Sequence, residues 1–373
     1  MDRRAVHPRH LAAMAAGAGV DAREICAMKV VMTLLVRDEA DIVDAQIAFH
    51  LHAGVDFVIA TDNRSQDGTT EILERYERAG FLHLLREEGD DMRQPEWVTR
   101  MARLAATDFG ADWVINADAD EFWWPRGGSL EDVFATVPER YGVIRGCWRH
   151  FLPRPDDKGF FAERMTVRLG MPAFPGDKKT IFHAHQKVAH RADGNVTIEA
   201  GNHNALGASL DPIRAWHPIE VLHFSFRSVQ QLERKGRGGW LRNAGYEPTL
   251  HQLLLDEALR TGRLEDFYAS FVVPDEALER GVRDGTLALD TRLRDALRKL
   301  RAENGTFRLP DSHSTLSFSR PDVREDALYA GEASVLVEID SIVRAEQRVG
   351  AFEERLAAVE RRPFSRLHRL ASR

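Results

Sequence analysis

Short apolar runs alternate with amphipathic stretches along the first third of the chain. The runs are rich in Val, Ile and Leu, as buried parallel strands are, and lie at residues 29–36, 56–61, 81–85 and 112–117. The stretches between them place apolar residues at helical spacing, for example Ile42, Ala45 and Phe49. This alternation with short connections predicts an α/β fold with a mostly parallel sheet flanked by helices.

The pattern changes in the second third of the chain. Residues 152–226 hold Pro, Gly and several short strand-like pieces, which predict mixed strands and loops that complete the sheet. From Ser228 onward helical patterns dominate. We therefore predict one main domain and place a soft boundary near its end. The predicted organisation is an extension at 1–27, the domain at 28–240, a helical region at 241–333 and a final segment at 334–373.

The final segment carries an apolar row in which successive members lie three, four or seven residues apart. Its members are Val335, Ile339, Ile342, Val349, Leu356 and Val359. This spacing predicts an amphipathic helix and leaves a short coiled coil, and so self-association, open. The tail at 361–373 has five arginines and no acid. Peripheral contact with an acidic membrane and a solvated, frayed end are the alternatives for it.

Composition narrows the class of protein. Of 373 residues, 43% are hydrophobic and 29% charged, as in ordinary globular proteins, and the formal net charge of -7 gives no reason to expect nucleic-acid binding. The two cysteines, Cys26 and Cys147, are too few for a disulfide framework or a zinc finger and fit a reducing cytosol. No apolar stretch is long enough for a membrane helix. We therefore expect a cytoplasmic protein, with the inner face of the cell membrane as an alternative location.

The most informative stretch is DWVINADADEF at 112–122. An apolar run leads directly into Asp118, Asp120 and Glu121. On an extended chain Asp118 and Asp120 project from one face, and carboxylates that close repel unless a cation lies between them. Mg²⁺ and Mn²⁺ favour such oxygen ligands, often together with phosphate oxygens. The stretch indicates a metal–diphosphate site at the carboxyl end of a strand, or otherwise an acidic solvated turn.

The loop after the second apolar run is the other strong feature. It reads DNRSQDGT from Asp62 to Thr69. Helix capping explains Asp67 and Thr69 without any function. It does not explain Asp62, which directly follows the strand where a ligand of the sheet end would lie. A carboxylate there suits hydrogen bonds from a base N–H or a ribose hydroxyl.

Taken together, LLVRDEADIV, ATDNRSQDGTTEIL and DWVINADADEFWW resemble the family-2-type glycosyltransferases with a GT-A, Rossmann-related fold. The resemblance spans roughly residues 29–235 and is closest to the branch whose Asp-x-Asp runs on into Glu-Phe. It implies that the first strand and its loop hold the nucleotide through Thr33, Val36, Arg37 and Glu39. It also implies that Asp62 contacts the base or ribose, Asp118 the ribose or metal, and Asp120 the metal.

Later residues extend the resemblance through EAGNHNA and VLHFSFRSVQQLERK. Many enzymes of this fold place a late His on the metal, which matches His203 or His223, and we slightly prefer His223 because it follows an apolar run. A hydrogen-bonded structural His is the alternative for each. Several cations are available to neutralise a diphosphate or to form a solvated face: Arg227, Lys235, Arg237, Lys178, Lys179 and Lys187.

The catalytic base is not evident from the sequence. An inverting transfer needs a carboxylate that takes the proton from the acceptor hydroxyl. The family's acidic pair is missing here, so Glu121, Asp193 and Glu199 are candidates, besides Asp177 and the pair Asp156–Asp157 in a Pro-rich loop. Inversion and retention both stay open. The pair Trp123–Trp124 suits either an acceptor platform or burial, which we favour for at least one of them.

These observations favour a hexosyltransferase-like enzyme. It would use Mn²⁺ or Mg²⁺ to move a sugar from a UDP-, GDP- or dTDP-sugar to a hydroxyl of a glycan or another acceptor. Phosphatases with an aspartyl nucleophile also use Asp-x-Asp, but after their first strand. The alternative is a catalytically degenerate nucleotide-binding or coiled-coil interaction module.

Overall fold

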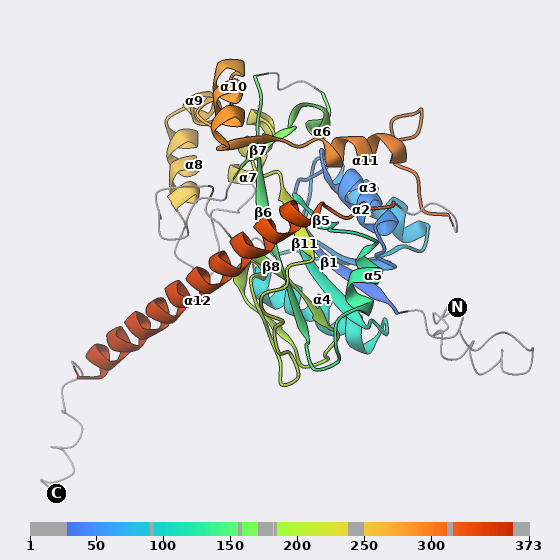
Figure 1. Ribbon diagram of the computed structural model, residues 1–373, viewed down its shortest axis with the longest axis vertical. Coiled ribbons are helices and arrows are strands. Elements are labelled where there is room, and N and C mark those ends of the chain that lie inside the picture. The colour runs from blue at the N-terminus through green and yellow to red at the C-terminus, as the bar shows by residue number, and fades with distance from the viewer. Residues whose placement is uncertain are drawn as a thin grey trace, which may run out of the picture.

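In the computed structural model, the described residues are 28–89, 93–155, 159–170, 182, 185–237, 250–311 and 316–360 (Figure 1). Several predictions fall outside them. These are the extension at 1–27, the basic tail at 361–373, and the side chains of Lys178, Lys179, Asp156, Asp157 and Asp177.

The first half of the sheet is parallel, as the apolar runs predict. Its strands are β1 (Val30–Val36), β2 (Phe57–Asp62), β3 (Leu82–Arg86) and β4 (Trp113–Asp118), in the order β3-β2-β1-β4. Every residue of β1 is buried, because helices cover both faces of a sheet built in this way. The register pairs Val36 with Asp62 and Leu35 with Asp118, so three carboxyl ends meet at one edge.

The second half of the sheet is largely antiparallel. It consists of β8 (Gln186–Arg191), β6 (Val143–Leu152), β7 (Val167–Leu169) and β12 (Leu287–Leu289), which continue the order outward from β4. A further strand, β11 (Ile219–His223), runs parallel to β6 and antiparallel to β5 (Glu121–Pro125). A separate small sheet pairs β9 (Thr197–Ile198) with β10 (Ala205–Leu206). The α/β class is confirmed, and the sheet as a whole is mixed.

Helices pack on both faces of this sheet. On one face lie α2 (Val43–His52) and α11 (Arg292–Leu300), whose apolar residues belong to the main core. On the other face lies α4 (Gln94–Thr107), which contacts β1, β2 and β4 and closes a second core. Shorter helices complete these layers: α3 (Thr69–Arg78), α5 (Leu130–Ala135), α6 (Phe161–Arg164) and the 3₁₀ turn η2 (Ala200–Asn202).

A helical layer follows the last central strand. Here α7 (Val229–Arg237) packs against α8 (Leu250–Arg260) and α9 (Leu264–Ala269) around a small apolar cluster. Next come α10 (Asp275–Asp284) and then α11, which returns to the main core and contacts α2. Helical patterns were predicted to dominate from Ser228 onward, although no helix was placed at Leu264–Ala269.

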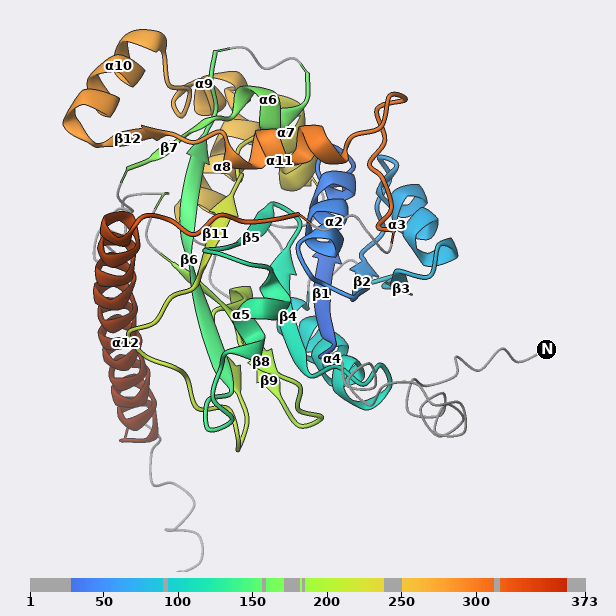
Figure 2. The same ribbon diagram turned by 45° about the vertical axis from the view of Figure 1, so that its right-hand side comes forward.

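The last element is the longest. α12 (Val323–Glu360) is a 38-residue helix that lies against the domain only near its start and then extends away from it (Figures 1 and 2). A helix over the final segment was predicted from the sequence, although from residue 334 rather than from Val323. No helix among the described residues is both long enough and apolar enough to cross a membrane.

Candidate functional site

From the sequence, the acidic motif was expected to lie on one extended strand, but in the structure the motif is divided between two strands. β4 ends at Asp118, residues 119–120 form a turn, and a new strand begins at Glu121. The chain turns here because β5 leaves β4 to pair with β11, whose His223 lies opposite Glu121. Asp120 is therefore held in a tight turn between two strands. Its buried carboxylate faces the loops above the sheet edge.

Asp118 and Glu121 share one buried cation, Lys187. Its Nζ donates to Asp118 Oδ2 at 2.6 Å and lies 2.9 Å from Glu121 Oε1. Glu121 Oε1 also accepts from Trp148 Nε1 at 2.7 Å, and Asp118 Oδ1 accepts from Asn202 Nδ2 at 3.0 Å. Burial raises the pKa of Glu121 to about 8, because Lys187 offsets only part of its desolvation and the neighbouring acids oppose its ionisation.

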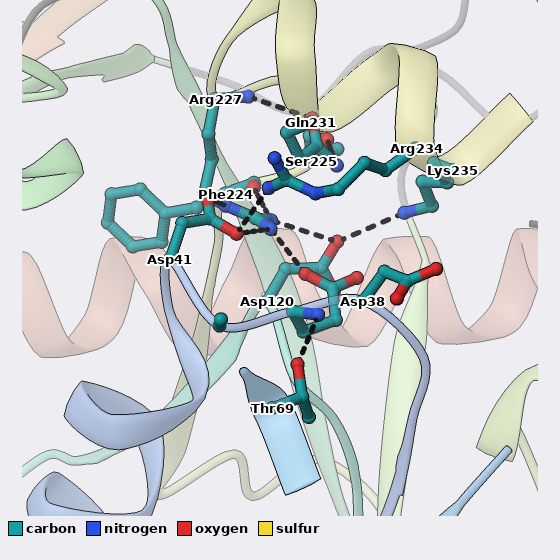
Figure 3. A network of polar contacts seen from close by, with 12 residues as sticks. Asp38, Asp41, Thr69, Asp120, Phe224, Ser225, Arg227, Gln231, Arg234 and Lys235 are labelled. Atoms are coloured by element: carbon teal, nitrogen blue, oxygen red, sulfur yellow. Dashed lines mark hydrogen bonds and ion pairs between the residues drawn. The ribbon is translucent and has the colours of Figure 1, made fainter. Parts of the chain in front are cut away.

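Asp120 is surrounded by two cations and an imidazole, of which Figure 3 shows the cations. Lys235 Nζ lies 3.4 Å from Oδ2, Arg227 Nη1 lies 4.0 Å from Oδ2, and His223 Nε2 lies 3.7 Å from Oδ1. Burial alone would raise the pKa of Asp120, but the positive field led by Lys235 outweighs it and holds that pKa well below the usual range. The carboxylate is thus kept ionised, as a metal ligand must be.

Arg227 connects this turn to the loop after β1. Its fully buried guanidinium pairs with Glu39 and, at 2.7 Å, with Asp41 Oδ2 (Figure 3). Arg234 reaches the same Asp41 carboxylate at 3.3 Å. Burial raises the pKa of Glu39 to about 7 despite Arg227. Arg227, just before α7, and Arg234 and Lys235, on α7, therefore lie together over the acids of two strand ends.

His223 lies at the end of β11 and is held by two neighbours. Its Nδ1 is 3.2 Å from His150 Nδ1, and the indole of Trp148 stacks on its ring with centroids 4.3 Å apart. Burial lowers the pKa of His223 well below its usual value, so the imidazole is neutral. A neutral ring with Nε2 turned toward Asp120 is the form that binds a metal.

His203, the other predicted metal candidate, has a different environment. Its Nδ1 donates to the carbonyl oxygen of Gln186 at 2.7 Å, and its ring stacks on His185 with centroids 3.7 Å apart. The neighbouring Asn202 is the residue that reaches Asp118. The segment therefore contributes Asn202 to the site, and the role of His203 as a metal ligand stays a prediction.

Of the residues predicted to hold the nucleotide, Val36 and Arg37 lie at the end of β1, whereas Thr33 lies in the middle of that strand. Thr33 is buried within the sheet and donates to Asn116 Oδ1 at 2.9 Å, and Val36 is buried at the strand end. Arg37 donates to Asn63 Oδ1 at 3.1 Å in the loop above. These contacts place Arg37 at the edge of the site and Thr33 inside the fold.

Asp62 organises its own loop. Its carboxylate accepts from the backbone N–H of Ser65 at 3.0 Å and from the hydroxyl of Thr70. Thr69 and Asp67 bond each other and the backbone of Glu39 and Ala40, which ties this loop to the one after β1. The two loops form one scaffold at the carboxyl edge of the parallel strands.

The positions of Asp193 and Glu121 argue against two of the three candidates for the catalytic base. Asp193 follows β8, which runs antiparallel to β4, so it lies near Trp113 at the far end of β4, about 16 Å from Asp118 at ~3.3 Å per residue. Glu121 is fully buried and both of its oxygens are hydrogen-bonded, which is the arrangement of a bracing residue. Glu199 directly precedes η2, the turn that supplies Asn202, and so lies near the motif.

The structure also shows the surroundings of the tryptophan pair Trp123–Trp124. Trp123 is fully buried, as predicted for at least one of the two. Trp124 is half-buried between Phe49, on which it stacks with centroids 5.8 Å apart, and the guanidinium of Arg292. The ring of Trp124, like that of Phe122, lies on the side of β5 that faces α2, while Trp123, the residue between them, is buried in the main core. Neither is placed as an acceptor platform above the acids.

Sequence reasoning missed Trp148, His150 and Asp41. The first two come from β6, and Asp41 from the polar RDEAD segment after β1. Only Asp41 had a local signal, because it follows a predicted strand just as Asp62 does. Lys187 was one of several cations offered for a diphosphate or a solvated face, and the structure instead buries it between Asp118 and Glu121.

The residues of the site fit a divalent metal only if a bound ligand supplies part of its coordination. Among the described residues, no group of three or more His, Cys, Asp or Glu side chains is arranged to hold an ion. Asp120 Oδ1 and His223 Nε2, 3.7 Å apart, are one carboxylate and one neutral imidazole facing a common point. Mg²⁺ and Mn²⁺ are commonly held by one or two protein ligands together with substrate phosphates, and this pair fits that mode.

No protein-family model matches the sequence, and no curated protein matches it. Among solved structures, the chain is similar to S. aureus TarS 1-349 in complex with UDP, at 11% identity and a TM-score of 0.31, over 79% of this chain and 100% of that one. It is also similar to glucosyl-3-phosphoglycerate synthase from Mycobacterium tuberculosis in complex with Mn²⁺, UDP and glucosyl-3-phosphoglycerate, at 19% identity and a TM-score of 0.24, over 40% and 50%. Because these TM-scores are low, the function is inferred from the residues of the site alone.

Proposed function

We propose that the protein is a glycosyltransferase that uses a nucleotide-diphosphate sugar. The observation that carries this proposal is the meeting of Asp118 and Asp120 with Lys235, Arg227 and His223 at the carboxyl edge of the parallel strands. Open α/β sheets bind ligands at this edge. The carboxylates of this site suit a divalent metal, and the cations that face them suit the oxygens of a diphosphate.

Each group has a distinct part in binding the donor. Asp120 and His223 would hold Mn²⁺ or Mg²⁺, which supplies Lewis-acid stabilisation of the departing diphosphate. Lys235, on α7, would exchange part of its pairing with Asp120 for phosphate oxygens. Arg227 keeps the loop of Glu39 and Asp41 in place, since its guanidinium is fully buried and paired. Asp118, held by Lys187 and Asn202, is fixed for a ribose hydroxyl.

For the chemistry we propose inversion by in-line displacement. The acceptor oxygen forms a bond to the anomeric carbon while the bond from that carbon to the diphosphate oxygen breaks, and the hydroxyl proton passes to a carboxylate. Glu199 is our candidate for that carboxylate, because it adjoins η2 and the other two candidates are buried or remote. Glu199→Gln is then expected to lower kcat about 10²-fold or more while donor affinity is kept.

Donor binding tests the proposal most directly. The full-length protein is heated with UDP-, GDP- and dTDP-sugars, with and without Mn²⁺, and the melting temperature is recorded. One donor at a hundred times its Kd adds about 2.7 kcal/mol to the free energy of unfolding. Asp120→Asn is expected to abolish the Mn²⁺-dependent part. Asp108→Asn, an exposed Asp at the end of α4, is the matched control and should leave it unchanged.

The same variants separate the enzyme from a binding module. Transfer or hydrolysis of the stabilising donor by the native chain, lost in Asp120→Asn, supports the enzyme. If the native chain binds a nucleotide yet turns over no donor with any acceptor tried, the protein is a nucleotide-binding module. If no nucleotide sugar stabilises the native chain with or without metal, the proposal fails altogether.

A further inference from the structure

The long helix α12 presents a strict heptad of exposed apolar side chains. Leu328, Val335, Ile342 and Val349 are spaced by seven residues, and each is more than half exposed. Phe352, three residues after Val349, is exposed as well. Monomeric proteins rarely leave a continuous apolar row in water. A row that repeats every seven residues is typical of a coiled-coil seam, because it stays on one side only if two helices supercoil.

The start of α12 is fixed to the domain, so the row leaves it in a defined direction. The ring of Tyr329 lies between the guanidiniums of Arg126 and Arg149, at 4.3 and 4.5 Å from its centroid. Its hydroxyl donates to the carbonyl oxygen of Ile219 on β11 at 2.7 Å. Glu332, one turn further, pairs with Arg149 at 3.0 Å. These contacts anchor the first turns of the helix on the sheet.

Beyond this anchor the helix runs alone. Val337 is the last residue of α12, in the described part of the chain, that joins the apolar cluster of Cys147, Tyr329 and Ala333. The remaining residues, 338–360, span about 34 Å at ~1.5 Å per residue. Figures 1 and 2 show this part extending clear of the sheet and of the helical layer. An isolated amphipathic helix of this length owes most of its stability to packing of its apolar face, which here requires another molecule.

The charges beside the seam identify the partner and its direction. With Val349 at heptad position a, Glu353 falls at e and Arg355 at g. In the sequence the same signs recur at neighbouring heptads, with Arg348 at g and Glu360 at e. Two copies in parallel set each g across from an e five residues later, which pairs Arg with Glu. An antiparallel pair would set Glu against Glu and Arg against Arg.

We propose that the protein self-associates through a parallel coiled coil of α12 with a second copy of this chain. Val335, Ile342 and Val349 supply β-branched residues at position a, and Ala345 and Phe352 occupy the d positions that follow Ile342 and Val349. Both catalytic domains then lie at the same end of the coiled coil, because the anchor of α12 is at its start. The proposal is independent of the proposed function, since it rests on no residue of the donor site.

The mass of the full-length protein in solution tests the proposal. Light scattering is expected to give twice the 42.2 kDa chain mass at micromolar concentration. Ile342→Asp combined with Val349→Asp is expected to give the single-chain mass, with an unchanged melting transition of the domain. Gln347→Asp, at the outward f position, is the matched control and should stay dimeric. A native chain that remains monomeric, or apolar-row variants that remain dimeric, would overturn the proposal.

Direction is tested separately by cross-linking. In a parallel pair Val349 meets its own counterpart, so Val349→Cys is expected to form a dimer linked by a disulfide under mild oxidation. Gln347→Cys should not, and the unsubstituted chain serves as the blank. Exchange of charge gives a second readout: Glu353→Arg alone is expected to weaken the dimer roughly two- to tenfold, and Arg348→Glu added to it to restore affinity. Absence of both the cross-link and the rescue contradicts the parallel arrangement.

Discussion

The strand pair β5–β11 has a buried ion cluster at each of its ends, and the two clusters are balanced differently. At the start of β11, Glu220 is surrounded by three guanidiniums, at 2.6, 2.9 and 3.4 Å, from Arg292, Arg149 and Arg126. Burial alone would raise the pKa of Glu220, but these cations outweigh burial and lower it to about 2. This carboxylate is fully satisfied, and it holds α11 and the start of α12 against the sheet.

At the other end of the same strands, acids crowd one another. Glu121, opposite His223 in the register, has its pKa raised to about 8, and the pKa of Glu39 in the loop nearby is raised to about 7. Burial is the first cause in both, and neighbouring acids add to it. The structural cluster matches each acid with cations, whereas the candidate site is left short of positive charge. That deficit is what a divalent cation bound with a diphosphate would fill.

The largest expected effect is on the free energy of unfolding, and it should differ between the clusters at the two ends of the strand pair β5–β11. Glu220→Gln leaves buried guanidiniums uncompensated and is expected to lower the free energy of unfolding by about 3–5 kcal/mol. Glu39→Gln is expected to cost less than about 1 kcal/mol at pH 7, because a carboxyl whose pKa is near 7 is as stable neutral as charged there. Urea denaturation of both variants measures the difference. Equal losses would show that the two clusters are equivalent.

The next effect is on activity at the site. Asp120→Asn keeps the shape of the side chain but removes the charge that faces Lys235 and His223. It is expected to reduce kcat of sugar transfer on the order of 10²–10³-fold. Steady-state kinetics with the donor found by thermal screening measure this. Glu220→Gln, assayed below its melting temperature, is expected to keep kcat within a few-fold, and a loss as large as that of Asp120→Asn would remove the distinction between the ends.

Acid is expected to remove the stabilisation by the ion cluster around Glu220 over a defined pH range. The pKa of Glu220 is lowered from 4.5 to about 2 in the folded protein, so its contribution is present above pH 4.5 and is lost as the pH falls from 4.5 to 2. That contribution is about 3 kcal/mol at 1.36 kcal/mol per pKa unit. The free energy of unfolding, measured against pH, is expected to fall less steeply across this window in Glu220→Gln. Parallel curves would contradict the assignment.

Sequence reasoning succeeded for the parts of the fold that are encoded locally. The strands β1, β2 and β4 are nearly continuous apolar runs because both of their faces are buried, and Gly54 and Gly80, with φ of 107° and 85°, end the helices that follow β1 and β2. The antiparallel half is not encoded in this way. Nothing in the residues around Asp193 indicates that β8 runs opposite to β4, and so the far position of Asp193 could not be foreseen.

The same distinction applies to the site. Asp118, Asp120 and Asp62 were identified because each directly follows a predicted strand. Trp148 was not, because it lies within β6 and reaches the motif only through the pairing of β6 with β11. Local patterns reveal which residues end strands, whereas the order of strands in the sheet determines which side chains meet.

The smallest expected effect concerns Trp148, which links Glu121 of the motif to the imidazole of His223. Its N–H donates to Glu121 and its ring stacks on His223, so it positions both without contacting the reacting atoms. Trp148→Leu is expected to weaken Mn²⁺-dependent donor binding about tenfold, as the loss of an outer partner of a metal ligand does. Trp148→Phe keeps a stacking face and is expected to cost only a few-fold.

Calorimetric titration with the nucleoside diphosphate, with and without Mn²⁺, separates positioning from general damage. Only the Mn²⁺-dependent part of the affinity should change in the Trp148 variants, while binding without metal stays the same. Trp97→Phe, a buried tryptophan of α4 in the second core, is the control and should alter stability but not metal dependence. If Trp148→Leu behaves like Trp97→Phe, the indole merely fills space, and the candidate site depends on Asp120 and its cations alone.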